Sequence, residues 1–278
     1  MNKAKIQSIF LKSIVYFAVT LTVMALLFIV GYILIQGVPH LSFDLFSLKY
    51  TSENVSLFPA LINTIIMTLL SLLIAAPLGI FSAIYLVEYA KRGNKLVAVV
   101  ATTAETLSGI PSIVYGLFGY LMFVVYLGWG YSLIAGAFTL AIMILPVIMR
   151  TTEEALKSVS DTFREGSFGL GAGKLRTVFK IVLPSAVPGI LAGIVLSVGR
   201  IVGETAALIY TAGTVAQIPD SLMSSGRTMS IHMYALWKEG FNADQSYATA
   251  VVLLVIVIGL NSLSAFIAKR ITKGKTNG

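Results

Sequence analysis

Long stretches of this chain contain no charged residue. The first covers 24 residues (13–36) and the second covers 30 residues (58–87). A helix needs about 20 apolar residues to cross a bilayer, so each stretch is long enough to span one. Hydrophobic residues make up 57% of the chain and charged residues only 12%, which leaves too little polar surface to cover a soluble globule. The sequence therefore predicts an all-α integral membrane protein.

Six membrane-spanning helices are predicted within a single domain that covers residues 1–278. Between residues 96 and 149 only Glu105 is charged, which is too long for one span, and a Gly-Trp-Gly segment at 128–130 divides it. The predicted spans are 13–36, 58–87, 96–127, 131–149, 185–208 and 246–268. Proline lacks an amide hydrogen and glycine loosens a helix, so helix breaks are expected at Pro77, Gly109 and Pro111.

Lysine and arginine divide unevenly between the two sides of the predicted bundle. Sixteen lie on the side that holds both termini and the loop 150–184, three lie on the other side, and Arg200 lies within a span. Cytoplasmic loops are enriched in basic residues, so we expect a multi-pass membrane protein with both termini and this loop in the cytoplasm. On the external side, residues 227–240 are expected to form an amphipathic helix at the surface. The net charge of +8 therefore requires no nucleic-acid partner.

No residue pattern points to catalysis or to a metal site. The chain has no cysteine, which excludes disulfides and thiolate ligands. His40 and His232 stand alone, so each is expected to be a loop residue and not a metal ligand. Residues 171–174 (Gly-Ala-Gly-Lys) lack the first glycine and the Ser or Thr of a phosphate-cradling loop. We therefore expect a chain that binds no ATP and is not an enzyme.

Two charged residues lie inside the predicted fifth span. A charge there costs roughly 2.5 to 3.5 kcal/mol by insertion scales, so Arg200 needs a compensating role. One interpretation is structural: Glu204, one helical turn further on, pairs with Arg200 and orders the bundle. The other is that Arg200 faces a transport path and offers its planar fork to an oxyanion, with Glu204 as its partner. Thr205 and Thr211 would add hydroxyls to such a path, and Glu105 is a weaker candidate.

The polar and basic interval 164–184, REGSFGLGAGKLRTVFKIVLP, carries a spaced motif. It resembles the EAA loop of ABC-importer permeases, E-A-A-x3-G-x9-I-x-L-P, with glycine and serine in place of the two alanines. In that family the loop forms a short cytoplasmic helix that sits in a cleft of the ATP-hydrolysing subunit. The alternative is a basic loop that only stays in the cytoplasm. The matching residues are Glu165, Gly166, Ser167, Gly171, Ile181, Leu183 and Pro184.

Three further segments sharpen the resemblance: GRIVGETA at 199–206, RTTEEAL at 150–156 and SGIPS at 108–112. Over nearly its whole length the chain is similar to phosphate-importer permeases of the PstA type, within the MetI-like family of binding-protein-dependent transport inner-membrane components. Ala207 replaces the proline found in that type. The resemblance implies a MetI-like fold and a location in the bacterial plasma (inner) membrane. It further implies a PstC-like partner permease, two PstB-like ATPase subunits and a PstS-like external phosphate-binding protein. It also implies that inorganic phosphate is carried, that this chain binds no cofactor, and that ATP and Mg are used by the ATPase.

The predicted function is a transmembrane permease subunit of an ATP-driven phosphate importer that works by alternating access. A permease for another oxyanion or solute is the alternative within the same class. A stand-alone secondary phosphate transporter is the alternative from a different class, and the EAA-like loop argues against it. An intramembrane enzyme would need Glu105 and Glu204, on different helices, as its acid and base.

Overall fold

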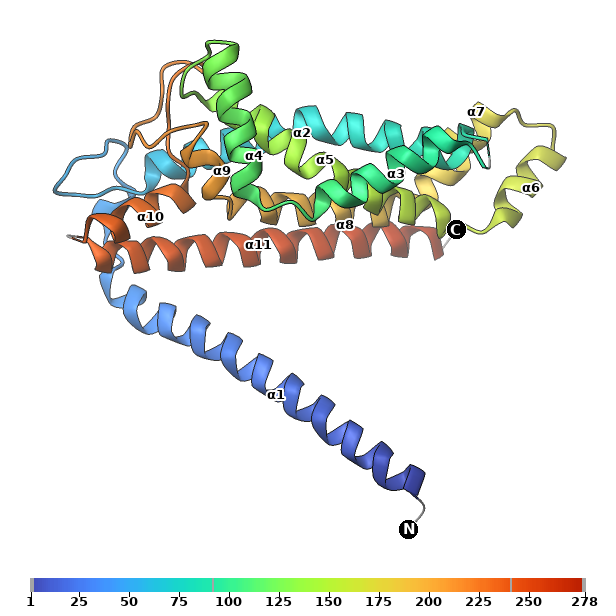
Figure 1. Cartoon of the computed structure of the whole chain (residues 1–278), viewed down its shortest axis with the longest axis horizontal. Helices are drawn as coiled ribbons and strands as arrows, with labels where there is room; N and C mark the ends of the chain where they lie inside the picture. Colours follow the sequence, from blue (N-terminus) through green and yellow to red (C-terminus); the bar gives the residue numbers. More distant parts are fainter. Residues whose placement is uncertain (1–2, 92, 241, 277–278) are drawn as a thin grey trace.

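The computed structural model describes residues 3–91, 93–240 and 242–276, and this part of the chain contains helices and no strand. Most of the long helices lie nearly parallel (Figure 1). Five helical runs are long and apolar enough to cross a membrane, and a bent helix pair makes a sixth candidate. The all-α membrane fold is thus confirmed. The helices of the five runs are α1 (Lys3–Gly37), α2 (Phe58–Ile84), α5 (Leu133–Lys157), α8 (Leu183–Val202) and α11 (Ala243–Thr276).

Shorter elements lie mainly at the two ends of the bundle. At one end are α6 (Asp161–Gly169) and α7 (Lys174–Thr177), and at the other are α9 (Ala206–Ile209) and α10 (Met229–Glu239) (Figure 1). The remaining turns are the 3-10 segments Val38–His40 and Phe43–Phe46 and the π segments Tyr85–Tyr89, Tyr120–Tyr126 and Val178–Val182.

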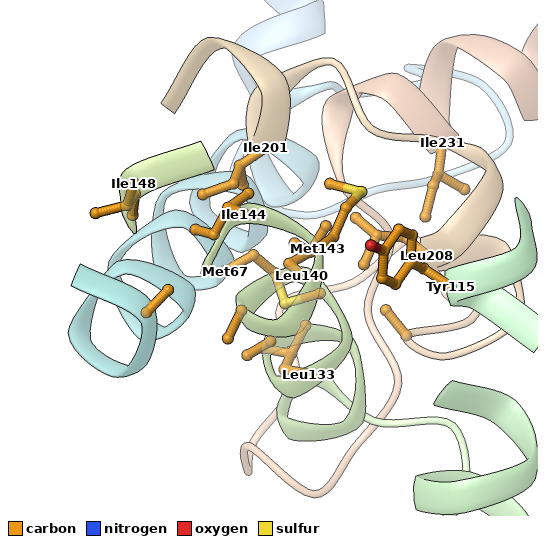
Figure 2. Close-up of a cluster of buried hydrophobic side chains, with 14 residues drawn as sticks. Met67, Tyr115, Leu133, Leu140, Met143, Ile144, Ile148, Ile201, Leu208 and Ile231 are labelled. Atoms are coloured by element: carbon orange, nitrogen blue, oxygen red, sulfur yellow. The ribbon is translucent and has the colours of Figure 1, made fainter. Parts of the chain in front are cut away.

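Helix α5 lies at the centre of the bundle, packed against α2 and α8. In its most apolar window 67% of the residues are buried. Helix association within lipid depends on close van der Waals contact, which small residues permit. A Cβ added at Gly79 of α2 would lie 3.0 Å from Ile148 of α5, and one at Gly193 of α8 would overlap Thr151. Figure 2 shows the resulting core, which joins α5 side chains such as Met143 to residues of α2, α8 and the short end helices.

Helix α1 stands apart from the bundle along most of its length (Figure 1). It meets α11 near its carboxyl end, where a Cβ at Gly37 would overlap the backbone of Tyr247. Both α1 and α11 are longer than the predicted spans 13–36 and 246–268. The reason is that basic and polar residues continue both helices past the apolar stretches, which alone were used to set the predicted ends.

The predicted third span is not one straight helix. The chain bends by 103° between α3 (Lys95–Ser108) and the run that begins with α4 (Ser112–Gly119), at the segment that contains Gly109 and Pro111. Helix α3 runs along α5, and α4 turns across the bundle toward α9 (Figure 1).

No helix break occurs at Pro77, contrary to the sequence-based expectation. Helix α2 continues through this proline to Ile84. Proline is tolerated in membrane helices where neighbouring elements hold the chain, and Gly79 packs directly on α5 two residues later.

The predicted boundaries of the fifth span were also wrong. The helical run extends from Lys174 to Val202, so it begins before residue 185 and ends before residue 208. Gly203 is its C-cap, and the chain then enters the short helix α9.

Candidate functional site

Helix α6 and the turn after it contain the EAA-like residues. The Ser160 side chain accepts a hydrogen bond from the amide of Thr162 at the start of α6. After α6 ends, Gly171 adopts φ +80°, a left-handed conformation that glycine adopts without steric cost. The Ser167 and Thr177 hydroxyls lie 2.8 Å apart and tie α6 to α7. The local sequence thus builds two short helices joined at a glycine.

Four of the seven motif residues line one groove. Gly166, Ser167, Gly171 and Ile181 border a cavity of about 510 Å³ at this end of the bundle. Leu183 and Pro184 are half-buried where α8 begins, Glu165 is exposed, and Ser167 is buried. The spacing therefore brings most of the motif together on one surface.

Apolar side chains project into solvent around this groove. Phe163 and Leu170 both line it, and they are 56% and 91% exposed. Gathered apolar side chains outside a lipid-facing surface mark an interaction site. The α6 end thus has the character of a docking surface.

A buried ion pair fixes α6 to the rest of the chain. Arg164 Nη2 donates to Glu88 Oε1 at 2.7 Å, and the two side chains are only 14% and 7% exposed. The same guanidinium donates to the carbonyls of Leu156 and Val159. Hydrogen bonding to Glu88 raises the pKa of Arg164. This contact was not predicted from the sequence. The one feature that could have indicated it is Glu88, the first charged residue after 30 uncharged ones.

The expected i, i+4 pair between Arg200 and Glu204 is absent, because α8 ends at Val202, between the two residues. Glu204 is 8% exposed, and its Oε1 accepts from the amide of Ala207 at 3.0 Å, in the first turn of α9. Half-buried Arg200 makes no ion pair within the described part of the chain. It lies in the last turn of α8, where the helix dipole favours a cation.

The other candidate path residues lie in three different settings. Thr205 borders an apolar cavity of about 760 Å³ between α1, α4, α10 and α11. Glu105 is exposed and pairs with Arg150 of α5 at 3.0 Å. The Thr211 hydroxyl is buried and donates to the carbonyl of Ala207. The side-chain contacts of Glu105 and Thr211 are thus made with other residues than Arg200.

At the opposite end of the bundle from α6, a helix is found within the predicted range 227–240, whereas the expectation that His232 is a loop residue was wrong. Helix α10 begins at Met229 and buries one face, on which His232 is completely buried. Burial and the nearby charge of Arg227 lower the pKa of His232 to about 3. Arg227 is itself only 4% exposed. Sequence reasoning missed this cluster, whose one signal was a basic residue on the poorly charged side.

Residues 75–276 match the family described as the binding-protein-dependent transport system inner membrane component. The chain belongs to this family. It is therefore a membrane-spanning permease subunit of an ABC importer of the MetI type, a multi-pass inner-membrane protein and not itself a catalytic subunit. No group of three or more His, Cys, Asp or Glu residues in the described ranges could hold a metal ion.

Several named relatives are phosphate permeases. The phosphate transport system permease protein PstA of Pasteurella multocida is 42% identical over 183 residues, 64% of this chain and 63% of the relative. PstA 1 of Mycobacterium tuberculosis is 34% identical over 76% of this chain and 68% of its own length. The probable ABC transporter permease protein YqgI of Bacillus subtilis is 34% identical over 88% of this chain and 90% of its own length.

The fold is also found in solved ABC importers. A bacterial transporter for the import of alginate matches with a TM-score of 0.65 at 20% identity, covering 95% of this chain and 99% of that one. The MetNI methionine transporter matches with a TM-score of 0.60 at 20% identity, covering 77% and 94%. At this identity the likeness concerns the fold alone.

Proposed function

We propose that this chain is the transmembrane permease subunit of an ATP-driven phosphate importer. The observation that carries the proposal is Arg200, which sits half-buried at the end of a membrane helix with no counter-ion in the described chain. A permanently charged planar fork suits an oxyanion. The PstA relatives support phosphate as that oxyanion. Phosphate passes by alternating access between this chain and a PstC-like permease.

The α6 end is the coupling surface in this proposal. Two PstB-like ATPase subunits use ATP and Mg, and one of them receives α6 in a cleft against the groove lined by Gly166 and Gly171. The exposed apolar side chains around the groove support docking. The Arg164–Glu88 pair then passes movement of α6 to the end of α2. A PstS-like protein delivers phosphate at the opposite end.

Removal of Arg200 tests the substrate path. Since Glu204 is held by α9, Arg200→Leu strands no ion-pair partner, and the single variant is informative. We expect normal assembly with the partner subunits and a loss of radiolabelled phosphate uptake of about tenfold or more. Arg200→Lys keeps the charge without the fork and should give intermediate uptake. The control is Lys238→Leu, which removes an exposed cation from α10. Wild-type uptake by Arg200→Leu at matched abundance would refute the assigned path.

Removal of the ATPase separates this proposal from a stand-alone phosphate transporter. An importer loses uptake without its ATPase, whereas a secondary transporter keeps it. Competition with sulfate tests the other alternative, a permease for a different oxyanion. A permease that selects phosphate should keep its phosphate uptake in excess sulfate, whereas a permease that prefers sulfate should lose it.

Topology is tested by cysteine labelling, because the chain has no cysteine of its own. The proposal places both termini and residues 150–184 in the cytoplasm. An impermeant thiol reagent added to intact cells should modify Asp220→Cys and spare Lys174→Cys, both at exposed positions. The reverse pattern would invert the proposed orientation.

A further inference from the structure

Unpartnered buried polar atoms concentrate at one place in the described chain. Six buried side-chain nitrogen or oxygen atoms lack a hydrogen-bond partner, and five of them belong to Asn63, Arg227 and His232. Native proteins satisfy nearly all buried polar groups, so such a concentration calls for an explanation. These residues come from α2, from the segment before α10 and from α10 itself. Asn63 Nδ2 donates to the carbonyl of Arg227, and the Tyr50 ring lies against both the Arg227 guanidinium and the His232 ring, so the three residues are neighbours at the end of the bundle opposite α6.

Arg227 is the cationic centre of this cluster. It is 4% exposed, and both Nε and Nη2, which form one edge of the guanidinium fork, are unpartnered. Arg227 Cζ lies over the Tyr50 ring, 4.7 Å from the ring centre. No carboxylate in the described residues is within ion-pair distance of it. Water could satisfy the two N–H groups, but it would not neutralise the buried charge. An anion would do both.

The neighbouring groups supply hydrogen-bonding capacity of both kinds. His232 is fully buried with two unpartnered ring nitrogens, and a neutral imidazole donates from one nitrogen and accepts at the other. Asn63 donates from Nδ2 to the carbonyls of Gln217 and Arg227, both at 3.1 Å, which leaves Oδ1 as a free acceptor. An anion bound here would meet donors from Arg227 and acceptors from Asn63 and His232.

The backbone around the cluster is held under strain. Val55 is buried and has φ +46°, the one positive value at a non-glycine position among the described residues. Its backbone approaches His232, although neither ring nitrogen makes a hydrogen bond of ordinary geometry. Strain of this kind persists where the surroundings enforce it and is frequent at ligand sites.

We infer that Arg227, His232 and Asn63 form an internal oxyanion site that takes inorganic phosphate. The two adjacent N–H groups of Arg227 match two oxygens of one phosphate. At neutral pH phosphate also carries at least one O–H, which can donate to Asn63 Oδ1 or to His232, whereas sulfate has no proton to donate. The inference rests on the proposed function for the identity of the anion, because this end of the bundle faces the supply of phosphate.

The test measures thermal unfolding of the full-length chain, purified with its partner subunits in a maltoside detergent that contains no phosphate. Inorganic phosphate should raise the wild-type midpoint by about 5 °C at one hundred times its Kd, and sulfate should raise it by less than about half as much. Without phosphate, Arg227→Met should be at least as stable as wild type, because it removes an unpaired buried charge. Of these two chains, only the wild type should gain stability on addition of phosphate.

Control variants keep the result decisive. Lys238→Met removes an exposed cation from α10 and should retain the full phosphate effect. Arg227→Lys preserves the charge, so it tests the fork even if Arg227→Met does not fold, and it should lose at least about half of the shift. An equal shift in wild type and Arg227→Lys, an equal shift with sulfate, or no phosphate effect on the wild type would each overturn the site. Stabilisation by an added partner protein but not by phosphate would assign Arg227 to a carboxylate instead.

Arg200→Leu distinguishes this site from the transport path. It should lower uptake by about tenfold or more and leave the Arg227-dependent part of the phosphate-induced shift intact. Uptake absent from the wild type with an intact shift would count against the proposed function alone. Normal uptake without an Arg227-dependent shift would count against this inference alone.

Discussion

Arg164 and Arg200 lie toward opposite ends of the bundle, and they differ in whether the side chain has an ion-pair partner within the described residues. Arg164, in α6, is held by Glu88 and by two backbone carbonyls, and its side chain is 14% exposed. Arg200, in the last turn of α8, is half-buried and makes no ion pair within the described residues. A charge that is neutralised inside the chain can transmit force between elements. A charge left without a partner can attract a ligand.

Arg227 extends the comparison, because it is more buried than Arg164 and yet has no counter-ion among the described residues. Truncating one partner of a buried pair leaves the other charge stranded, whereas removing an unpaired charge does not. Removal of the carboxylate that pairs with Arg164 should therefore lower stability. Removal of the unpaired charge of Arg227 should not.

Breaking the Arg164–Glu88 pair should have the largest effect on stability. Glu88→Ala removes the buried partner of the Arg164 guanidinium and leaves it only the exposed carboxylate of Asp161 and two backbone carbonyls. The variant should cost about 3 kcal/mol, measured as thermal unfolding of the purified chain. The exposed pair of Arg150 and Glu154 provides the control, and Glu154→Ala should change stability little. Exchange of the charges, Glu88→Arg with Arg164→Glu, should recover part of the loss. Equal effects of Glu88→Ala and Glu154→Ala would remove the distinction between paired and unpaired arginines.

Stability at the opposite end should depend on pH through His232. Its pKa is lowered from 6.5 to about 3 by burial and by Arg227, and Tyr50 is the other ionisable group that faces the ring. Below pH 6.5 the unfolded chain binds a proton that the folded chain refuses until about pH 3. The folded state should therefore lose about 2 kcal/mol between pH 7 and pH 5.

The check is thermal unfolding of wild type and His232→Gln at both pH values. The variant lacks the titrating group, so the difference between pH 7 and pH 5 should shrink by the predicted amount. If wild type and His232→Gln lost the same stability between pH 7 and pH 5, His232 would be hydrated or paired. The polar atoms of the cluster would then not be unsatisfied.

A smaller effect is expected at the turn after α6. Gly171 has φ +80°, so Gly171→Ala should introduce strain of about 1 kcal/mol and displace α7 from the groove. Gly173→Ala is the matched control, because Gly173 has φ −73° and open space around it. Phosphate uptake should fall in the first variant and stay at the wild-type level in the second. Equal uptake in both would detach the turn from coupling.

Local sequence patterns predicted the features that depend on neighbouring residues. Uncharged length located the membrane helices, and the spacing from Glu165 to Pro184 located a groove that is built from one continuous segment. The all-α fold and the membership of the ABC-importer permeases follow from such patterns. Continuous segments fold in a way that their own residues largely determine.

Features that join distant segments could not be predicted. Glu88 and Arg164 are 76 positions apart, and no spacing rule connects them. The end of α8 at Val202 accompanies the capping of α9 by Glu204, so an ideal helix drawn through Arg200 and Glu204 gave a false pair. The continuity of α2 at Pro77 also depends on a distant segment, because the packing of α2 on α5 keeps the helix intact.

The smallest effect is expected from substitution of Glu105, which was predicted from the sequence to be a candidate path residue. Its carboxylate lies 3.0 Å from Arg150 Nη1, and both side chains are more than half exposed. Exposed ion pairs contribute little, since water and salt screen them. Glu105→Gln keeps the shape of the side chain and removes its charge, so phosphate uptake should stay within about twofold of wild type. Thr102→Ala, one turn earlier on α3, controls for substitution of that helix. If Glu105→Gln instead reduces uptake as strongly as Arg200→Leu, Glu105 belongs to the path, and its pairing with Arg150 holds only in one state of the transport cycle.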